Sequence, residues 1–411
     1  MTMSSRARVL AAINHREPDR VPIDLGGTRV TGIEPGLYTR LRDRLGIAGD
    51  PAKVMDVWQM LAWVEQPVVQ ALGADVLPVP RLVQDFGMRI DAWRPWRLDD
   101  GTPVQMPANF APVREPDGSL CIYLDGELVG KKVPSSPYFD RMVEMKVYDP
   151  LPPVETWRMP LFSDEDLAWR RKWAETLRAE TDKALAGEFG PILGRWGSYQ
   201  ELMYTIGARP EYVLAYYERK VEYLLANLRL YRDAVGGNID LIWWGEDFGT
   251  QTGLMISPRM FREMVAPCYK RIWDWVHAHT PWKVFYHCCG AIYSIIPTLI
   301  ECGVDILNPV QTSARGMDPA RLKAEFGDRL TFWGGGVDTQ QALPYGTPEE
   351  VRTQVRERIQ VFGPGGGFVF NPIHNVQPDV PLENLIAMFA AVHEFGQYPL
   401  DFFGNRKPVS P

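Results

Sequence analysis

The sequence predicts an α/β protein with a (β/α)8 TIM barrel fold, and three observations support this prediction. From about residue 160 onward, short apolar runs alternate with longer amphipathic segments. Apolar and polar residues do not alternate within these runs. Continuous apolar runs are typical of strands that are buried on both faces of a parallel sheet. No G-x-G-x-x-G motif follows an early strand, and this argues against an open dinucleotide-binding sheet.

The predicted strands are rich in Val, Ile, Phe and Trp and are bounded by Gly or Pro, as buried strands are. The five clearest read IDLIWWG (239–245), WKVFYH (282–287), VDILNPV (304–310), LTFWGGG (330–336) and GFVFNP (367–372). Two weaker runs lie upstream, ADVLPV (74–79) and PILGRW (191–196). Together these runs fit an eight-fold barrel better than an open sheet.

The segments between the runs carry signals of helix ends. Residues 257–279 and 347–363 begin with Ser-Pro and Thr-Pro, respectively, which are N-terminal capping signals. Gly303 and Gly363 lie where two of the predicted helices should end.

Residues 84–150 do not show this alternation of apolar runs and amphipathic segments, and contain short strand-like pieces instead. Three Asp-Gly turn signals separate these pieces, at residues 100–101, 117–118 and 125–126. We expect a β-rich excursion near the N-terminal third of a single domain that spans residues 1–411. The excursion should lie over the barrel mouth, where Trp93, Trp96 and Phe110 would help to select the substrate.

Composition excludes several classes of protein. The 411 residues include 44 basic and 51 acidic side chains, giving a net charge of −7, so a clustered positive surface for nucleic acid is not expected. No signal peptide and no apolar run of about 18 residues is present. The five cysteines are too few and odd in number for a disulfide framework. We therefore expect a cytoplasmic protein with reduced thiols and no membrane contact. A homodimer is one oligomeric state that the sequence allows.

Polar side chains follow five successive predicted strands. In chain order these side chains are Glu246 and Asp247, then His287 and Cys289, then Asn308 and Gln311, then Asp338, and finally His374. The active site of a β/α barrel lies at the carboxyl ends of its strands. A barrel with only a structural role would not need proton-active groups at each of these ends, so the pattern favours an enzyme.

The stretch FYHCCG (285–290) predicts a metal site. Side chains alternate between the two faces of a strand, so His287 and Cys289 point the same way, and Cys288 points away as a small buried hydrophobe. One imidazole and one thiolate suit zinc, and His374 is the best-placed third ligand. Other readings stay open: a His-x-Cys pair can be ordinary packing, His374 a hydrogen-bonded loop histidine, and Glu246 and Asp247 loop caps.

Several long blocks resemble the uroporphyrinogen decarboxylase superfamily, and in particular its corrinoid-dependent (methylcobamide) methyltransferase branch. They begin with RVLAAINHREPDRVPIDLGG, GEDFGTQTGLMISPRMFREMVAPCYKRI and HCCGAIYSIIPTLIECGVDILNPVQ, and continue with LKAEFGDRLTFWGGGVDTQQALPYGTPEEVRTQVRERI and GGGFVFNPIHNVQPDVPLENLIAMFAAV. The resemblance covers nearly the whole chain and implies a β/α barrel.

The resemblance also implies a choice between two chemistries. Decarboxylases of the superfamily carry a Gln-Ala-Gly-Arg-type stretch, whereas this chain reads PIDLGGTRVTGI. Methyltransferases carry a His-x-Cys strand end and a distant cysteine that together hold zinc. His287 and Cys289 match the first part, and His374 occupies the position of the distant cysteine. Other relatives use a pterin acceptor, need no metal and rely on an acid.

We therefore expect a methyltransferase that moves a methyl group between a methylated corrinoid and a small acceptor, such as a thiol or tetrahydrofolate. His287, Cys289 and His374 are the expected zinc ligands, with Glu246 as a further candidate. Expected catalytic residues are Asp247, Asp338 and Glu246, and expected substrate-binding residues are Asn308, Gln311 and Gln251.

The chain lacks the corrinoid-binding D-x-H-x-x-G motif. The corrinoid should therefore arrive on a partner protein or as free cobalamin. The alternatives are a carboxy-lyase of the decarboxylase type and a non-catalytic corrinoid- or metal-binding protein.

Overall fold

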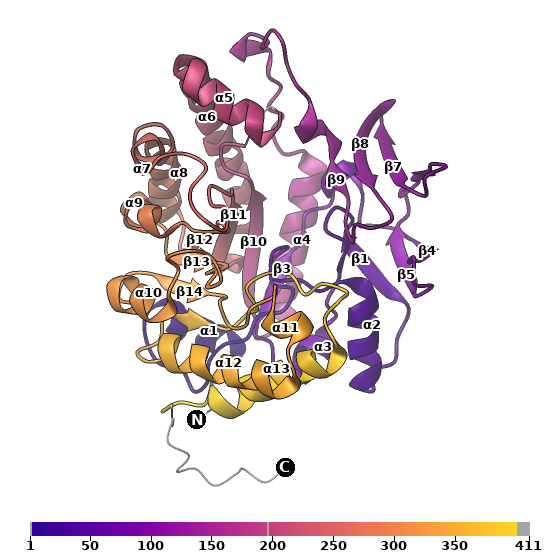
Figure 1. Cartoon of the computed structure of the whole chain (residues 1–411), viewed down its shortest axis with the longest axis vertical. Helices are drawn as coiled ribbons and strands as arrows, with labels where there is room; N and C mark the ends of the chain where they lie inside the picture. The colour runs from indigo at the N-terminus through magenta and orange to yellow at the C-terminus, as the bar shows by residue number, and fades with distance from the viewer. Residues whose placement is uncertain (1, 195–196, 401–411) are drawn as a thin grey trace.

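A parallel sheet that curls around itself forms the centre of the protein, whose computed structural model describes residues 2–194 and 197–400 (Figure 1). The strand order is β15-β14-β13-β12-β11-β10-β3, and all neighbouring pairs are parallel. The strands are β3 (Val76–Val79), β10 (Ala184–Gly190), β11 (Leu241–Gly245), β12 (Lys283–His287), β13 (Ile306–Asn308), β14 (Thr331–Trp333) and β15 (Phe368–Val369).

A short extended segment closes the sheet into a barrel. Ile23 forms a parallel bridge with Phe370, just beyond β15. The Phe370 N–H donates to the Pro22 carbonyl at 2.8 Å, and the Asp24 N–H donates back to the Phe370 carbonyl at 2.9 Å. On the other side, the Asp75 N–H donates to the Ile23 carbonyl at 2.8 Å, next to β3. This segment takes the eighth strand position, and the predicted (β/α)8 barrel is confirmed.

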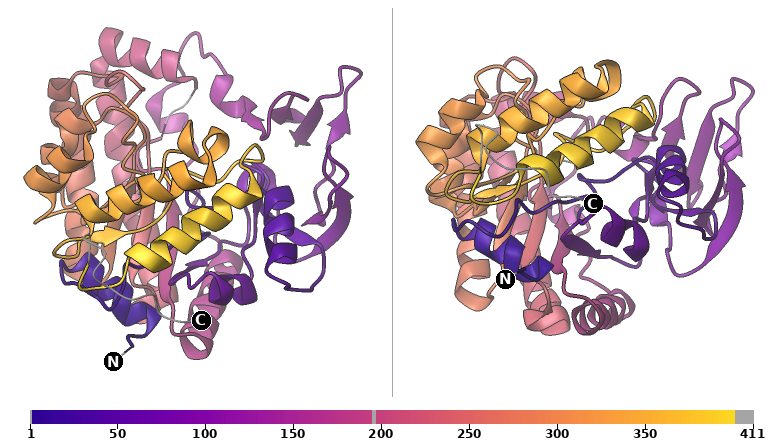
Figure 2. Two further views of the ribbon diagram at one scale, coloured as in Figure 1. Left: turned by 60° about the horizontal axis from the view of Figure 1, so that its bottom comes forward. Right: turned by 90° about the horizontal axis from the view of Figure 1, so that it is seen from below.

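Helices alternate with the barrel strands and cover the outside of the barrel (Figures 1 and 2). They are α3 (Gln66–Ala71), α4 (Asp164–Glu180), α6 (Pro210–Val235), α8 (Ala266–His279), α9 (Ile296–Cys302), α10 (Pro319–Phe326), α12 (Pro348–Phe362) and α13 (Leu382–Phe395). The remaining α-helices are α1 (Ser5–Ile13), α2 (Pro35–Arg44), α5 (Tyr199–Ala208), α7 (Pro258–Met260) and α11 (Ala342–Tyr345).

The predicted helix-end signals act locally as expected. Thr347 and Glu350 form a reciprocal capping box at the start of α12. Gly303 ends α9 with φ 106°, a left-handed conformation that glycine adopts without a steric penalty. Gly363 also ends α12, but its φ of −67° is right-handed.

Strand alternation divides the core into an inner and an outer layer. Trp243, Phe285 and Trp333 lie in a cluster inside the barrel, together with Val9 and Ile13 of α1. The Gly367 N–H donates to the Ala12 carbonyl, which ties α1 to the start of β15. The helix α1 therefore plugs the amino-terminal end of the barrel and leaves the carboxyl end for function.

The other faces of the same strands pack under the helices. Trp244, Tyr286 and Phe332 belong to the large outer cluster, which contains most of the buried apolar side chains. Burying a side chain of this size stabilises a fold by about 2 kcal/mol or more. The barrel strands are therefore apolar on both faces, which explains why their sequences show no alternation.

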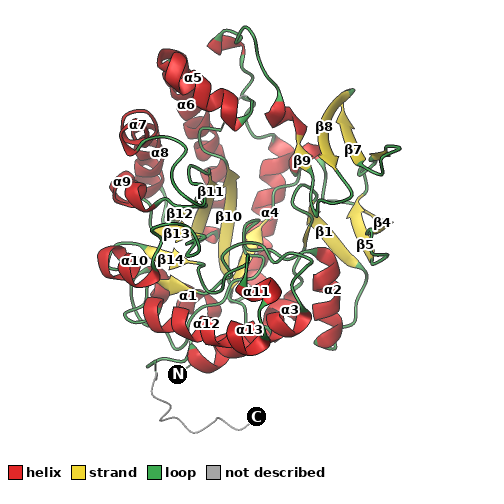
Figure 3. Cartoon of the chain, viewed as in Figure 1, coloured by secondary structure: helices red, strands yellow, loops and turns green. Residues whose placement is uncertain are grey.

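A β-rich layer lies beside the barrel, and it is separate from the barrel strands in Figure 3. One of its sheets has the order β2-β1-β5-β4 and the other β6-β7-β8-β9. The strands are β1 (Ala52–Asp56), β2 (Leu61–Ala62), β4 (Trp93–Arg97), β5 (Pro103–Pro107), β6 (Val113–Arg114), β7 (Leu120–Leu124), β8 (Glu127–Lys132) and β9 (Asp140–Arg141).

The predicted turns connect antiparallel strands of this layer, and the layer has its own apolar cluster around Phe86, Phe110 and Phe139. Its limits differ from the predicted 84–150. The layer begins at Ala52, because β1 pairs in parallel with β5. Sequence reasoning missed this pairing because about fifty residues separate the two strands.

One predicted strand was wrong. Residues 191–194 form an irregular segment after Gly190, while residues 195–196 lie outside the described part of the chain. The barrel strand is β10, with the sequence ALAGEFG. Its alanines, leucine and glutamate are common in helices, so local propensity hid it; pairing with β3 and β11 makes it a strand.

Among the described helices, none combines the length and the apolar character needed to cross a membrane.

Candidate metal centre at the barrel mouth

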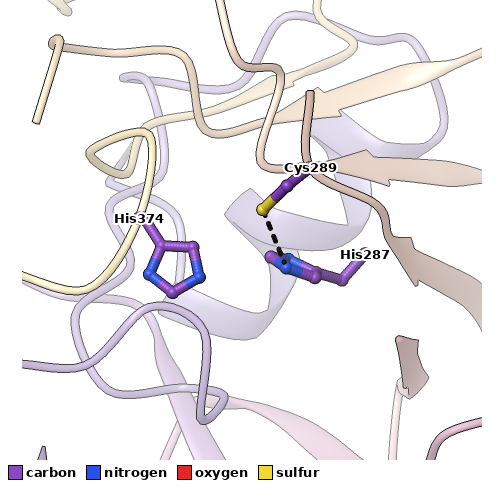
Figure 4. A group of neighbouring side chains, drawn as sticks. All are labelled: His287, Cys289 and His374. Atoms are coloured by element: carbon purple, nitrogen blue, oxygen red, sulfur yellow. Dashed lines mark hydrogen bonds between the residues drawn. The ribbon is translucent and has the colours of Figure 1, made fainter. Parts of the chain in front are cut away.

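Three of the residues singled out in the sequence meet at the carboxyl end of the barrel. His287 is the last residue of β12, Cys289 follows it, and His374 lies in the loop after β15. One donor atom from each residue lies within 4.8 Å of the others. Figure 4 shows His374 facing the pair formed by His287 and Cys289 from the opposite side.

The face assignment within FYHCCG is confirmed by the packing. Phe285 lies in the inner cluster, whereas Tyr286 and Cys288 lie in the outer cluster under the helices. Cys288 is buried, and its sulfur accepts the Phe248 N–H at 3.3 Å. The Cys289 sulfur instead lies 3.4 Å from Nε2 of His287.

Asn308 fixes the orientation of the His287 ring. The Asn308 Nδ2 donates to the Trp333 carbonyl at 2.8 Å, so its Oδ1 faces Nδ1 of His287 at 2.5 Å. An amide oxygen only accepts hydrogen bonds, and Nδ1 must therefore carry the proton. The lone pair of His287 then lies on Nε2, which is the nitrogen next to Cys289. Histidine ligands of metals are commonly held in this way by a second group.

The donor set fits a zinc ion. Two imidazoles and one thiolate are zinc ligands, and three protein ligands with an open fourth position are typical of catalytic zinc. Bond lengths of about 2.0–2.1 Å to nitrogen and 2.3 Å to sulfur separate adjacent donors of a tetrahedral site by roughly 3.6 Å. The 3.4 Å separation between Cys289 and His287 is close to that value, and donors at the 4.8 Å limit of the group would have to approach by about 1.2 Å.

Burial and charge set the protonation of the three side chains. Burial, and then the neighbouring His287, lowers the pKa of His374 to about 4, so its imidazole is neutral at pH 7. Burial, and then the carboxylate of Asp247, raises the pKa of the Cys289 thiol well above its ordinary value. The metal-free thiol is therefore protonated, and a bound cation would favour its deprotonation.

Asp247 lies at the edge of this group. Its Oδ1 accepts the Cys289 N–H at 2.7 Å and lies 3.8 Å from Nε2 of His287. The Asp247 side chain is 41% exposed, while that of His287 is 7% exposed. A carboxylate that is both solvent-accessible and close to the ligands can exchange a proton with a substrate bound there.

Glu246 corrects one expectation. Its carboxylate accepts hydrogen bonds from the backbone of Leu193 and Gly194 and from the Tyr269 hydroxyl at 2.6 Å. Tyr269 belongs to α8, outside the barrel. Alternation from the inward-facing Trp243 turns Glu246 outward. Glu246 is therefore not a fourth ligand, and its bonds make it a structural carboxylate.

Asn308 corrects a second expectation. Its two polar groups bind His287 and Trp333, and it is completely buried. It therefore positions the ring of His287, and both of its polar groups already have partners. Gln311 also supports the site, because its Oε1 accepts the Gly290 N–H at 2.7 Å and holds the loop after Cys289.

The remaining expected residues lie further around the mouth. Gln251 donates to the side chain of Gln340 at 2.8 Å in an exposed position. Asp338 accepts the Gln340 N–H at 2.7 Å and stabilises the loop before α11. The group of metal-binding geometry found in the described chain contains neither Asp338 nor Glu246.

A cavity of about 690 Å³ lies between the β-rich layer and the barrel mouth. Trp96, Phe110 and Phe139 line it from the β-rich layer, and Gln340 and His374 line it from the barrel loops. The layer therefore forms one wall of this cavity, and His374, a candidate metal ligand, forms part of another. Trp93, which we expected to act with Trp96, packs against Trp63 instead.

Two features of the mouth escaped the sequence analysis. Asn371 is completely buried, and neither polar atom of its side chain has a hydrogen-bond partner in the described structure. Arg29 forms ion pairs with Asp56 and Asp85 at 2.6 and 2.5 Å, which tie the barrel to the β-rich layer. The sequence around these two residues gave no signal of these surroundings.

Part of the chain matches the model of a known protein family. Residues 216–395 match the family model described as uroporphyrinogen decarboxylase (URO-D). The predicted family is confirmed over these residues. The matched segment covers less than half of the chain, and it contains His287, Cys289 and His374.

Two curated relatives are similar over short stretches. The uroporphyrinogen decarboxylase of Psychromonas ingrahamii is 40% identical over 78 residues, which cover 19% of this chain and 21% of the relative. That of Methylococcus capsulatus is 34% identical over 100 residues, which cover 24% of this chain and 27% of the relative. The matches thus span about a quarter or less of the length of these relatives.

A solved structure is similar over nearly the whole chain. A methyltransferase from Methanosarcina mazei superposes with a TM-score of 0.59 at 17% identity, covering 96% of this chain and 99% of that protein. At this identity the similarity establishes the shared fold.

Proposed function

We propose that this protein is a methyltransferase that moves a methyl group between a methylated corrinoid and a small acceptor, with zinc held by His287, Cys289 and His374. The observation that carries the proposal is the convergence of these three donors within 4.8 Å at the barrel mouth. The methyltransferase from Methanosarcina mazei, which has the same fold, supports the reaction class.

When bound, zinc would bind the thiol group of the acceptor and lower the pKa of that thiol, so that a thiolate is present at neutral pH. The chain's own residues prepare this site. Asn308 keeps the lone pair of His287 on Nε2, and Gln311 holds the loop that carries Cys289. Asp247, at 3.8 Å from His287, accepts the acceptor's proton and passes it to solvent.

The corrinoid acts as a substrate in this reaction. The acceptor's lone pair forms a new bond to the methyl carbon while the cobalt–carbon bond breaks, and cobalt(III) becomes cobalt(I) by keeping the bonding electron pair. The protein contributes orientation and a deprotonated acceptor. We propose that the corrinoid arrives as free cobalamin or on a partner protein.

The carboxy-lyase is the second candidate, because the curated relatives are uroporphyrinogen decarboxylases. A lyase of this kind would need cationic side chains for the carboxylates of its substrate. Arg29, in the stretch that replaces the family's arginine-rich pattern, is already bound by Asp56 and Asp85. This pairing favours the methyltransferase.

The test is to incubate the zinc-loaded protein with methylcobalamin and either a thiol or tetrahydrofolate, and to follow the visible spectrum of the corrinoid. We expect demethylation that depends on the thiol and stops when a chelator removes zinc. Folate-dependent demethylation that is insensitive to chelator would contradict the zinc role and favour acid assistance by Asp247. Carbon dioxide release from a porphyrinogen, with no corrinoid change, would establish the lyase instead.

A further inference from the structure

The cavity beside His374 has an unusual charge. Its walls in the described structure carry the carboxylates of Glu34, Asp99, Asp100 and Asp379 but only one lysine, Lys132. The net charge of the walls is therefore about −3, a large part of the −7 carried by all 411 residues.

Most of these carboxylates lack a cation. In the described part of the chain, Lys132 pairs with Asp99, at 2.7 Å. Asp100 accepts the Thr102 N–H at 2.9 Å, and Asp379 accepts the Tyr345 hydroxyl at 3.2 Å. Neither of them, nor Glu34, has an ion-pair partner among the residues that the structure describes.

Glu34 and Asp100 repel each other across this wall. Burial, and then Asp100, raises the pKa of the Glu34 carboxyl, although two backbone amides and Arg40 oppose the change. Like charges held close together cost free energy, and a cation placed between them removes that cost. An anionic ligand, in contrast, would add to the repulsion.

Aromatic rings form the rest of the wall. Trp96 and Tyr138 line the cavity, and Tyr138 is 43% exposed. Trp96 packs edge-on against Phe110 at 5.1 Å, and Arg94 lies 6.0 Å from its ring. Carboxylates together with tryptophan and tyrosine faces are the surroundings that select alkylammonium groups.

We propose that this cavity binds a small substrate through a cationic alkylammonium group, held by Glu34, Asp100 and the rings of Trp96 and Tyr138, with its reactive end toward His374. The inference rests on the proposed methyltransferase only for the reactive end, and the cation site stands on the cavity alone. It requires an alkylammonium group on the small substrate and excludes anionic thiols.

The test compares choline with its uncharged isostere 3,3-dimethylbutan-1-ol, using calorimetry and tryptophan fluorescence on the full chain without zinc or corrinoid. We expect choline to bind at least tenfold more tightly, and this preference to shrink at high salt because Asp99, Asp100 and Asp379 are exposed. Asp100→Asn and Trp96→Leu should each weaken choline binding by fivefold or more.

Two variants serve as matched controls. Asp117→Asn removes a carboxylate from another turn of the β-rich layer, and Trp93→Leu removes a tryptophan from the same strand as Trp96. Neither residue lines the cavity, so both variants should bind choline as the wild type does. Equal binding of choline and the isostere, no binding of either, or equal losses in test and control variants would overturn the proposal.

This result is separable from the proposed reaction. Cys289→Ala should bind choline normally, because the cation site does not include the sulfur. Choline binding without any corrinoid demethylation would overturn the methyltransferase alone. Demethylation without a preference for choline would overturn the cation site alone.

Discussion

The Oδ1 atom of Asn308 lies 2.5 Å from Nδ1 of His287, and this contact determines which ring nitrogen faces the candidate metal site. Removing it should weaken zinc binding without removing a ligand. We expect Asn308→Ala to lower zinc affinity about 10- to 100-fold. Asn308→Asp keeps an acceptor for the same N–H and should retain most of the affinity. Competition with a chromophoric chelator measures both variants, and equal losses in the two would contradict the orienting role.

The adjacent cysteines offer a direct comparison of the two strand faces. Cys289→Ala removes a donor from the group of three and should abolish zinc binding at neutral pH. Cys288→Ala changes a buried side chain of the outer core and should leave zinc content unchanged. It should lower stability by about 1 kcal/mol through lost packing. Measuring the zinc content of the purified variants tests this difference. Similar zinc loss in both variants would show that the assignment of the two cysteines to the inner and outer faces is wrong.

Zinc binding should release one proton at pH 7 to 8. The pKa of Cys289 is raised, so its thiol is protonated before zinc binds, whereas His374, with a pKa of about 4, has no proton to release. Because one proton leaves, affinity should rise about tenfold for each pH unit in this range. Calorimetry in buffers of different ionisation enthalpy counts the protons. A count near zero or two would refute this assignment of protonation states.

The neighbouring carboxylates Glu246 and Asp247 should respond differently to neutral substitution. Asp247→Asn keeps an acceptor for the Cys289 N–H and should keep zinc, but it should slow corrinoid demethylation by about 10²- to 10⁴-fold. Glu246→Gln should leave the rate unchanged and lower the free energy of unfolding by about 1–3 kcal/mol, because it loses acceptor capacity for Leu193 and Tyr269. Rate measurements and urea titrations test the pair. A slow Glu246→Gln enzyme of normal stability would restore the catalytic role first expected for Glu246.

Asp24, on the segment that closes the barrel, should make stability depend on pH. Burial raises the pKa of Asp24 to about 6, against hydrogen bonds from Trp333 and Gly27 that lower it. A raised pKa means that the folded protein holds this proton more tightly than the unfolded chain. The resulting stabilisation is present below about pH 4 and is lost as pH rises through 6, and it is roughly 3 kcal/mol at most.

Asp24→Asn should flatten this part of the stability profile. Urea titrations between pH 4 and 7.5 measure the slope, which separates the proton from any constant loss caused by the altered hydrogen bonds. An unchanged slope in the variant would show that another group is responsible.

The sequence alone determined the fold class and most of the candidate metal site. Parallel strands that are buried on both faces need continuous apolar runs, and those of β11 to β15 were visible as such. Because parallel strands end at one edge, polar residues after successive runs had to approach one another. The period of two along a strand was sufficient to separate Cys289 from Cys288.

Tertiary structure alone decided the features that depend on partners distant in the chain. Pairing with β3 and β11 made a strand of ALAGEFG, whose residues favour helices, and hydrogen bonds to Phe370 and Asp75 made residues 22–24 the eighth strand. Glu246 and Asn308 looked like site residues, but the hydroxyl of Tyr269 and the ring of His287 fixed their roles. Local sequence encodes propensity and face, whereas register, closure and the partner of each polar atom arise only when segments far apart in the chain come into contact.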